Sequence, residues 1–114
     1  YMERLRMVED RALFHEEIWL SASRFGALLE IDSASFGELL YPLYEKQCGQ
    51  CIASAKETLT VGAADKAMAD TLSIKVGAPM VSIERTALGY DRCPLEYRLS
   101  RAAADGFRYQ IEIS

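Results

Sequence analysis

Two arginines near the start of the chain have a type and spacing that suggest chemistry. Arg4 and Arg6 are two residues apart in an alternating run, so their side chains share one face of a strand. Two guanidinium groups on one face form a fork that suits a phosphate or a carboxylate. The alternative is that both arginines belong to the solvated face of a sheet edge. The pattern indicates an anion site without naming the anion.

Three glutamates occupy strand positions where a carboxylate needs an explanation. Glu16 and Glu57 lie on the apolar faces of alternating strands, and Glu96 shares a face with Arg98 just after Pro94. A carboxylate on a core-facing position is costly unless a partner pairs with it. Strand curvature can expose Glu16, and an arginine of a neighbouring strand can pair with Glu57. Glu96 can form a surface ladder with Arg98. With the two arginines, these glutamates favour a polar pocket.

The cysteines and the single histidine fit no catalytic or metal-binding pattern. Cys48 and Cys51 form a CxxC, but the pair follows a helical pattern, where the helix dipole disfavours a thiolate. A zinc site needs four ligands, and His15 is distant in the sequence. No nucleophile, histidine and carboxylate are arranged as a triad. We therefore expect Cys48 to pack at a helix end, and we predict no metal and no cofactor.

Composition excludes several classes of protein. The chain has 114 residues, of which 50% are hydrophobic and 26% charged, which suits one core. The net charge of −4 argues against direct contact with nucleic acid. No apolar run approaches the roughly 20 residues of a membrane span, and the odd number of cysteines without a signal peptide fits the cytoplasm. Because the chain starts at Tyr1, we expect it to be part of a longer protein.

Alternation and turn signals predict the element order β-β-α-α-β-α-β-β-β. Short turns between most strands make the sheet largely antiparallel, with the helices packed on one face of an α+β fold. Pro42 predicts a kink in the second helix or a break into two pieces. The last strand is apolar on one face, which could pair with a second subunit or face its own helices. The predicted strands are 3–8, 12–20, 51–61, 79–88, 95–101 and 107–113, and the predicted helices are 21–29, 35–48 and 63–72.

Short runs along nearly the whole chain also form an ordered series. They are Glu3–Arg6, Glu16 ahead of Trp19–Leu20, Leu40–Glu45, Cys48–Gly49, Ala55–Glu57, Ala63–Leu72, Gly77–Val81, Ile83–Arg85, Pro94–Tyr97 and Asp105–Tyr109. The series resembles the UTRA domain, the UbiC transcription-regulator-associated domain of HutC-type regulators in the GntR family. No single run is diagnostic, but the order of the runs is fairly specific.

The resemblance implies a chorismate-lyase-like fold and a ligand-binding and dimerisation domain over residues 1–114. It implies a homodimer, a winged helix-turn-helix outside this chain that binds operator DNA, and a small anionic metabolite as effector. Effector binding would change the spacing of the two DNA-binding heads. Two other functions stay open. A pocket with arginines and a glutamate also suits an enzyme of the chorismate-lyase type, and the domain could dimerise without binding a ligand.

By position, the resemblance also assigns roles to single residues. Arg4 and Arg6 match the paired basic residues that hold the anionic end of the effector. Glu16 matches an acidic pocket residue, Tyr41 a tyrosine at the start of the long helix, and Glu96 a glutamate that orients the polar body of the ligand. The predicted ligand-binding residues are Arg4, Arg6, Glu16, Tyr41, Glu57, Glu96 and Arg98.

Two departures from the family pattern bear on the ligand. The family often has a serine where this chain has Leu39, and a tyrosine where it has Ala102. Both changes remove hydroxyl groups from a site that would hold a phosphosugar. A less polar ligand that carries a carboxylate is therefore as consistent with the sequence as a phosphosugar.

Overall fold

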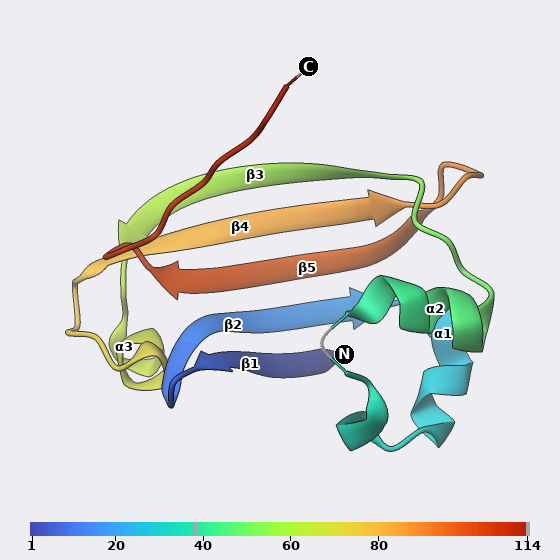
Figure 1. Cartoon of the computed structure of the whole chain (residues 1–114), viewed down its shortest axis with the longest axis horizontal. Coiled ribbons are helices and arrows are strands. Elements are labelled where there is room, and N and C mark those ends of the chain that lie inside the picture. The colour runs from blue at the N-terminus through green and yellow to red at the C-terminus, as the bar shows by residue number, and fades with distance from the viewer. Residues whose placement is uncertain (38, 114) are drawn as a thin grey trace.

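The computed structural model describes residues 1–37 and 39–113 as one antiparallel sheet with short helices at its two ends (Figure 1). The 5-stranded sheet has the order β1-β2-β5-β4-β3, and every neighbouring pair is antiparallel. The predicted α+β fold class is confirmed. The strands are β1 (Met2–Val8), β2 (Arg11–Leu20), β3 (Ser54–Ala63), β4 (Pro79–Leu88) and β5 (Pro94–Ala103), and the helices are α1 (Ala22–Phe25), η1 (Gly26–Glu30), η2 (Ser33–Ser35), α2 (Leu40–Cys48) and α3 (Lys66–Leu72), of which η1 and η2 are 3₁₀ turns.

The strand register brings charged residues of all the strands to one face of the sheet. Arg4 of β1 lies opposite Glu16 of β2. Arg98 of β5 lies opposite Arg85 of β4, and Arg85 lies opposite Glu57 of β3. Directly opposed residues in an antiparallel pair point to the same side. A polar row therefore crosses the sheet from edge to edge.

The main core lies where α1, η1 and α2 meet the ends of β2 and β5. Ile18 and Tyr44 are fully buried there, and Phe25 packs edge-on against Tyr44 with ring centroids 5.0 Å apart. α2 ends at Gly49, whose φ of 65° places it in the left-handed region that favours glycine. The buried members of this core are Ile18, Phe25, Leu28, Leu40, Tyr44 and Leu95.

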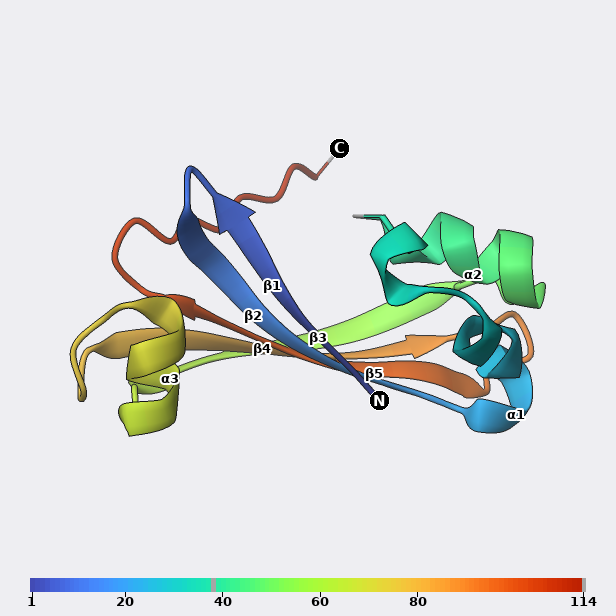
Figure 2. The ribbon, with the colours of Figure 1, turned by 90° about the horizontal axis from the view of Figure 1, so that it is seen from below.

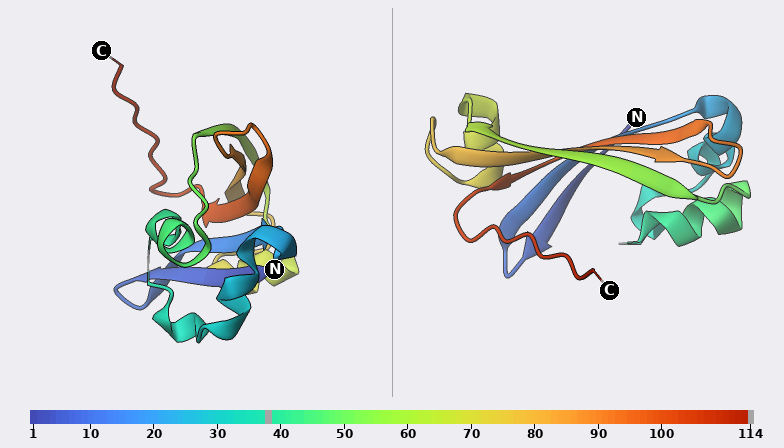
Figure 3. Two further views of the ribbon diagram at one scale, coloured as in Figure 1. Left: turned by 90° about the vertical axis from the view of Figure 1, so that its right-hand side faces the viewer. Right: turned by 90° about the horizontal axis from the view of Figure 1, so that it is seen from above.

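α3 lies on the opposite side of the sheet from α2 (Figures 2 and 3). Its apolar side packs with Ala64 and Met80 in a second, smaller core. Met80 points away from the face of its neighbour Val81, because side chains alternate along a strand. In this detail the structure differs from the prediction of helices on one face. Because side chains alternate along β4, this strand presents apolar side chains to both faces of the sheet, with Met80 facing α3.

Of the predicted helix 35–48, only residues 40–48 form an α-helix, α2, and Ser35 is the last residue of the separate turn η2. Pro42 lies in the first turn of α2, where its missing N–H has no intrahelical partner to lose. The break therefore falls before Leu40 and not at the proline. Glu38, within the predicted range, lies outside the described residues. The remaining short α-helices also begin later than predicted or stop earlier, and β3 begins at Ser54 rather than at 51.

The predicted strand 107–113 is wrong for the single chain. The described part of this segment is extended but belongs to no sheet. β5, which precedes it, already has β2 on one side and β4 on the other. The edge strands β1 and β3 do not pair with it either, so the apolar alternation alone did not determine sheet pairing.

None of the helices within residues 1–37 and 39–113 has the length and hydropathy of a membrane span.

A single cap stabilises the start of α3. The carboxylate of Asp65 accepts a hydrogen bond from the backbone N–H of Met68 at 2.8 Å. We expect Asp65→Ala to lower the free energy of unfolding by about 1 kcal/mol, which is a fall of roughly 4–8 °C in Tm for a domain of this size. Thermal unfolding followed by circular dichroism measures this change.

Asp70→Ala is the matched control, because Asp70 is exposed in the last turn of the same helix and caps nothing. We expect it to leave Tm unchanged or slightly raised, since alanine favours a helix. Equal losses from both substitutions would contradict the assignment of the cap.

Candidate ligand-binding site

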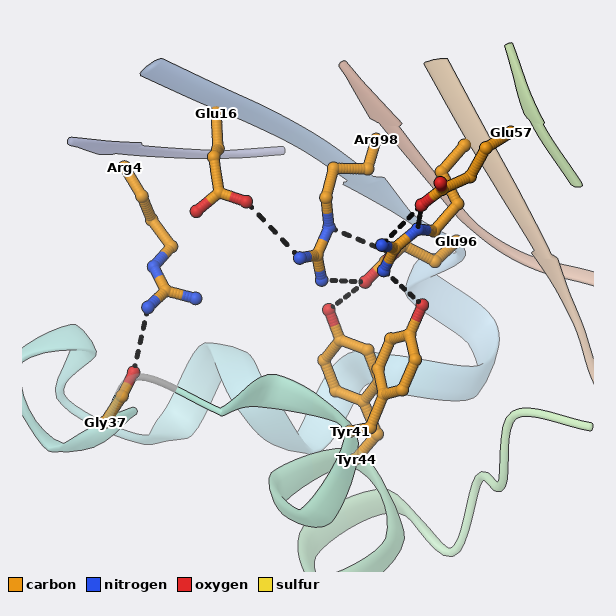
Figure 4. A network of polar contacts seen from close by, with 9 residues as sticks. Arg4, Glu16, Gly37, Tyr41, Tyr44, Glu57, Glu96 and Arg98 are labelled. Atoms are coloured by element: carbon orange, nitrogen blue, oxygen red, sulfur yellow. Dashed lines mark hydrogen bonds and ion pairs between the residues drawn. The ribbon is translucent and has the colours of Figure 1, made fainter. Parts of the chain in front are cut away.

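A buried carboxylate ties the sheet to α2. The side chain of Glu96 on β5 is 0% exposed. Its Oε2 accepts hydrogen bonds from the Tyr44 hydroxyl at 2.5 Å and from Arg98 Nη2 at 2.8 Å, and its Oε1 accepts one from Arg98 Nε at 3.1 Å (Figure 4). Glu96 and Arg98 are two residues apart on one strand, so their side chains meet on one face. The burial cost of this charge is offset by a full set of donors.

Burial and neighbouring charges shift the pKa values of two groups in this cluster, Arg98 and Tyr44. Burial by itself would lower the pKa of Arg98. The hydrogen bonds and negative charge of Glu96, and then the negative charge of Glu16, outweigh this effect and hold the pKa of Arg98 above its ordinary value. Burial, together with the negative charge of Glu96, raises the pKa of Tyr44 well above its ordinary value. Tyr44 therefore keeps its proton at neutral pH and donates a hydrogen bond to Glu96.

A second ion pair joins β3 to β4 and again reaches α2. Arg85 Nη2 lies 2.5 Å from Glu57 Oε1, and Arg85 Nη1 donates to the Tyr41 hydroxyl at 3.1 Å. The ring of Tyr41 lies 6.0 Å from the guanidinium carbon of Arg85 and 5.7 Å from that of Arg98. Like charges directly opposed on a sheet repel. The Tyr41 ring and the glutamates therefore let Arg85 and Arg98 stand side by side.

Glu16 has a carboxylate oxygen without a partner. Its Oε2 accepts from Arg98 Nη1 at 3.3 Å, whereas its buried Oε1 has no hydrogen-bond partner within the described residues. The Glu16 side chain is only 5% exposed. A buried polar atom left unpaired costs free energy, on the order of 1–3 kcal/mol. Such an atom is an acceptor that a bound molecule can satisfy.

A cavity of about 160 Å³ is lined in part by Glu16. Arg6 on its wall forms no hydrogen bond or ion pair within residues 1–37 and 39–113, in contrast to Arg85 and Arg98. The cavity wall thus includes a cation without a described partner and the residue Glu16, whose buried Oε1 lacks a donor. Its lining residues are Arg6, Phe14, Glu16, Glu57, Ile83, Arg85, Arg98 and Ser100.

Arg4 lies next to this cavity and contacts the segment that precedes α2. Its Nη2 donates to the carbonyl oxygen of Gly37 at 3.1 Å (Figure 4). Gly37 has a φ of 75°, which a residue with a side chain adopts only with strain. β1 is thereby linked to the start of α2 through a side chain of the predicted anion fork.

The structure brings the predicted residues together but gives them different positions. Arg6, Glu16, Glu57 and Arg98 line the cavity. Glu16 is buried, and Glu57 has the arginine partner that the sequence leaves open. The other predicted residues contact this group without lining the cavity: Arg4 through Gly37, Tyr41 through Arg85, and Glu96 through Arg98 and Tyr44.

Sequence reasoning missed Arg85 and Tyr44. Arg85 stands in an apolar alternation between Ile83 and Ala87, which was itself a signal that this arginine is paired or functional. Tyr44 has the spacing of a core residue, and the structure does bury it in the core. No local pattern shows that its hydroxyl meets a carboxylate from a strand 52 residues away.

A larger hollow of about 360 Å³ lies between the start of β1 and the α1–η2 region, and no charged residue lines it. It therefore offers no charged side chain to balance an anion.

Leu39, at a position where the family often has serine, is 73% exposed, and Ala102 is buried opposite Val81. Cys48 packs against the main core as expected, whereas Cys51 lies in no strand.

The fold and the cavity define a single-sheet α+β domain with a polar, ligand-sized hollow on the face of the sheet whose arginines and glutamates contact α2. The sequence model of the UTRA domain matches residues 1–108. This chain therefore belongs to the UTRA domain family. Among curated proteins no sequence matches it.

Solved structures agree with this assignment. The ligand-binding domain of a GntR-family transcriptional regulator from Bordetella bronchiseptica is 26% identical with a TM-score of 0.87, over 98% of this chain and 72% of that chain. A GntR-family regulator from Enterococcus faecalis V583 is 21% identical with a TM-score of 0.84, over 98% of this chain and 78% of that chain. PhnF from Mycobacterium smegmatis is 20% identical with a TM-score of 0.86, over 98% of this chain but 48% of that chain.

The Tyr44–Glu96 hydrogen bond predicts a pH-dependent loss in Tyr44→Phe. Near pH 7 we expect this variant to lose about 1–3 kcal/mol of unfolding free energy, because Glu96 loses a buried donor. The pKa of Tyr44 in the folded chain lies above the ordinary tyrosine value of 10.0, so the contribution of Tyr44 to stability is complete below pH 10. This contribution is lost as the pH rises from 10 toward the pKa of the folded state, because the unfolded chain then releases a proton that the folded chain keeps. The deficit of Tyr44→Phe should therefore shrink above pH 10. Denaturant unfolding at several pH values measures it.

Tyr90→Phe is the control, since Tyr90 is 81% exposed. It should match the unsubstituted chain across the same pH range. A deficit in Tyr44→Phe that stays constant above pH 10 would argue against a raised pKa of Tyr44.

Proposed function

We propose that this chain is the effector-sensing domain of a DNA-binding transcriptional regulator and that it binds a small anionic metabolite in the cavity beside Arg6. The observation that carries the proposal is the charge state of the cavity wall. Arg85 and Arg98 have glutamate partners, whereas Arg6 has none within the described residues. A carboxylate or phosphate on the ligand would supply that missing partner.

The buried oxygen of Glu16 adds a second requirement. An acceptor without a donor favours a ligand that brings a hydroxyl, amide or ammonium group to it. The cavity volume of about 160 Å³ is close to the space that a benzene-sized molecule fills. We therefore expect a compact ligand with an anionic group at one end and a hydrogen-bond donor at the other.

Ligand binding would act on α2 through the arginines. Arg85 holds the Tyr41 hydroxyl, and Arg4 holds the carbonyl of Gly37 just before α2. An anion beside Arg6 competes with these contacts for guanidinium donors. The position of α2 and of the segment before it would then differ between the free and the bound domain, which is the differential contact that allosteric coupling needs.

The wider role follows from the family. In this proposal the domain forms a homodimer, its regulator binds operator DNA through a winged helix-turn-helix outside this chain, and the protein works in the cytoplasm without catalysing a reaction. The relative PhnF is about twice as long as this chain, which leaves room for such a DNA-binding part. The acidic net charge of −4 suits a domain that does not itself contact DNA.

Arg6→Ala tests the anion site. We expect a ligand at 100 times its Kd to stabilise the unsubstituted chain by about 2.7 kcal/mol, which is a rise in Tm on the order of 10 °C. Arg6→Ala should lose this rise and keep the Tm of the free domain. Thermal shifts against phosphosugars, dicarboxylates and aromatic acids, chorismate included, measure it.

Arg11→Ala is the matched control, since Arg11 is exposed and lies outside the cavity. It should keep the full ligand shift. A ligand whose shift survives Arg6→Ala would overturn the proposed site, and consumption of that ligand would instead identify an enzyme.

Glu16→Gln tests the second requirement. Succinate, malate and aspartate share two carboxylates and differ in carrying no added donor, a hydroxyl or an ammonium group. We expect the chain to bind the donor-bearing members more tightly, and Glu16→Gln to weaken the ammonium-bearing one by about tenfold or more, as for a hydrogen bond to a charged group. Titration calorimetry measures the three affinities.

Glu17→Gln is the control, because Glu17 points to the other face of β2 and pairs with Arg101. It should leave all three affinities unchanged. Equal binding of succinate and aspartate to the unsubstituted chain would show that Glu16 does not select the ligand.

A further inference from the structure

The cavity that Arg6 lines has a neighbour on the same face of the sheet. Two of its wall residues, Glu57 of β3 and Ile83 of β4, also line a hollow of about 440 Å³. The other walls of this hollow are Leu59 of β3 and, from the segment after β5, Phe107 and Tyr109. Because the cavity and the hollow share two walls, they lie side by side over the sheet.

The cavity and the hollow differ in chemistry. Arginines and glutamates form most of the cavity wall, whereas Glu57 is the one charged side chain of the hollow within residues 1–37 and 39–113. Its partner Arg85 lies 2.5 Å away, so the charge of Glu57 is balanced where the two spaces meet. The remaining walls of the hollow are aliphatic or aromatic, which is the kind of surface that holds an apolar group.

The segment after β5 forms one side of the hollow. The backbone N–H of Phe107 donates to the carbonyl of Ala104 at 3.0 Å, in the turn by which the chain leaves β5. The segment then runs on the same side of the sheet as α2, and the β1–β2 hairpin curves toward that side as well (Figures 2 and 3). This face therefore carries Arg6 on the hairpin and two aromatic residues on the segment across from β3.

The strand order sets the order of chemical groups along the combined space. Arg6 lies on the edge strand β1, Glu16 on β2, and Ile83 on β4, with β5 between β2 and β4. Neighbouring strands are about 4.8 Å apart, which separates the backbones of β1 and β4 by roughly 14 Å. A molecule that contacts both ends is therefore elongated, with an anionic group first, a hydrogen-bond donor next and an apolar group last.

The volumes agree with an elongated ligand. The cavity of about 160 Å³ is smaller than the sites that bind small molecules in proteins, which measure roughly 300–1,000 Å³. The adjoining hollow of about 440 Å³ brings the combined space into that range. Such sites are mostly apolar and contain a few placed polar groups. The hollow supplies the apolar part that the cavity alone lacks.

We infer that the ligand of this domain carries an alkyl or aromatic group, which lies in the hollow between Leu59 and the aromatic residues of the segment after β5. The inference rests on the proposed function, because it takes the anionic end of the ligand to be held by Arg6. Leu59 is 43% exposed and Tyr109 is 62% exposed. An apolar group would remove these walls from water and gain affinity, whereas a phosphosugar is polar along its whole length.

A homologous series of acids tests the apolar end of the ligand. The α-hydroxy acids α-hydroxybutyrate, α-hydroxyhexanoate and α-hydroxyoctanoate share the carboxylate and the hydroxyl group and differ only in chain length. We expect the affinity of the unsubstituted chain to rise by about tenfold or more with each added pair of methylenes, because each buried methylene contributes roughly fourfold. Titration calorimetry measures the three dissociation constants.

Leu59→Trp fills the hollow from its β3 wall. We expect this variant to bind α-hydroxybutyrate as the unsubstituted chain does and to lose the gain of the two longer acids. Thr58→Trp is the matched control, because Thr58 is exposed on the same strand and points to the other face of the sheet. It should keep the full gain with chain length.

Arg6→Ala separates this inference from the proposed function. Loss of all three acids in Arg6→Ala, with a length-dependent gain that Leu59→Trp removes, would support both. Equal affinities for the three acids that are lost in Arg6→Ala would overturn the inference and leave the proposed function standing. A gain with length that survives Leu59→Trp would place the apolar group elsewhere and would overturn the inference too.

The remaining outcome is that none of the three acids binds. If a phosphosugar then raises Tm in the unsubstituted chain and fails to do so in Arg6→Ala, the inference is overturned and the anion site stands. If no anion of either kind shifts Tm, both the inference and the proposed function are overturned.

Discussion

The rest of the site depends on the buried carboxylate of Glu96. A charge that is removed from water must be compensated in full, and Arg98 and Tyr44 do so from the same strand and from α2. Removing one partner of such a buried pair costs about 3–5 kcal/mol, so the position of α2 over the sheet is set by this contact as much as by apolar packing. α2 is held at that place with its tyrosines aimed at the charged row of the sheet (Figure 4).

The arginines of the polar row on β4 and β5 have glutamate partners, whereas two groups nearer β1 lack a described partner. Glu57 and Glu96 neutralise Arg85 and Arg98, and the ring of Tyr41 lies near both guanidinium groups. Toward β1 the compensation stops: Arg6 has no ion-pair partner within residues 1–37 and 39–113, and Glu16 Oε1 has no donor. Unpaired groups destabilise a domain unless binding uses them. This corner of the sheet face is therefore the place where the proposed ligand would find unpaired groups.

Membership of the UTRA domain family explains the arrangement without dictating the ligand. Function resides in the site rather than in the fold. Here Leu39 faces solvent and Ala102 is packed in the sheet, so neither offers a hydroxyl to a phosphosugar. Arg85 on β4 is paired with Glu57 and contacts Tyr41, so Arg6 is the arginine of the cavity wall without a described partner.

The sequence by itself determined the local features: the alternation of each strand, the faces shared by Arg4 with Arg6 and by Glu96 with Arg98, and the α+β class. These follow from the two-residue period of a strand, which neighbours along the chain display directly. Only the tertiary structure decided that β5 lies between β2 and β4, and hence that Glu16 meets Arg98. It also decided that residues 107–113 pair with no strand among the described residues. Strand adjacency depends on contacts between distant residues, which no local pattern contains.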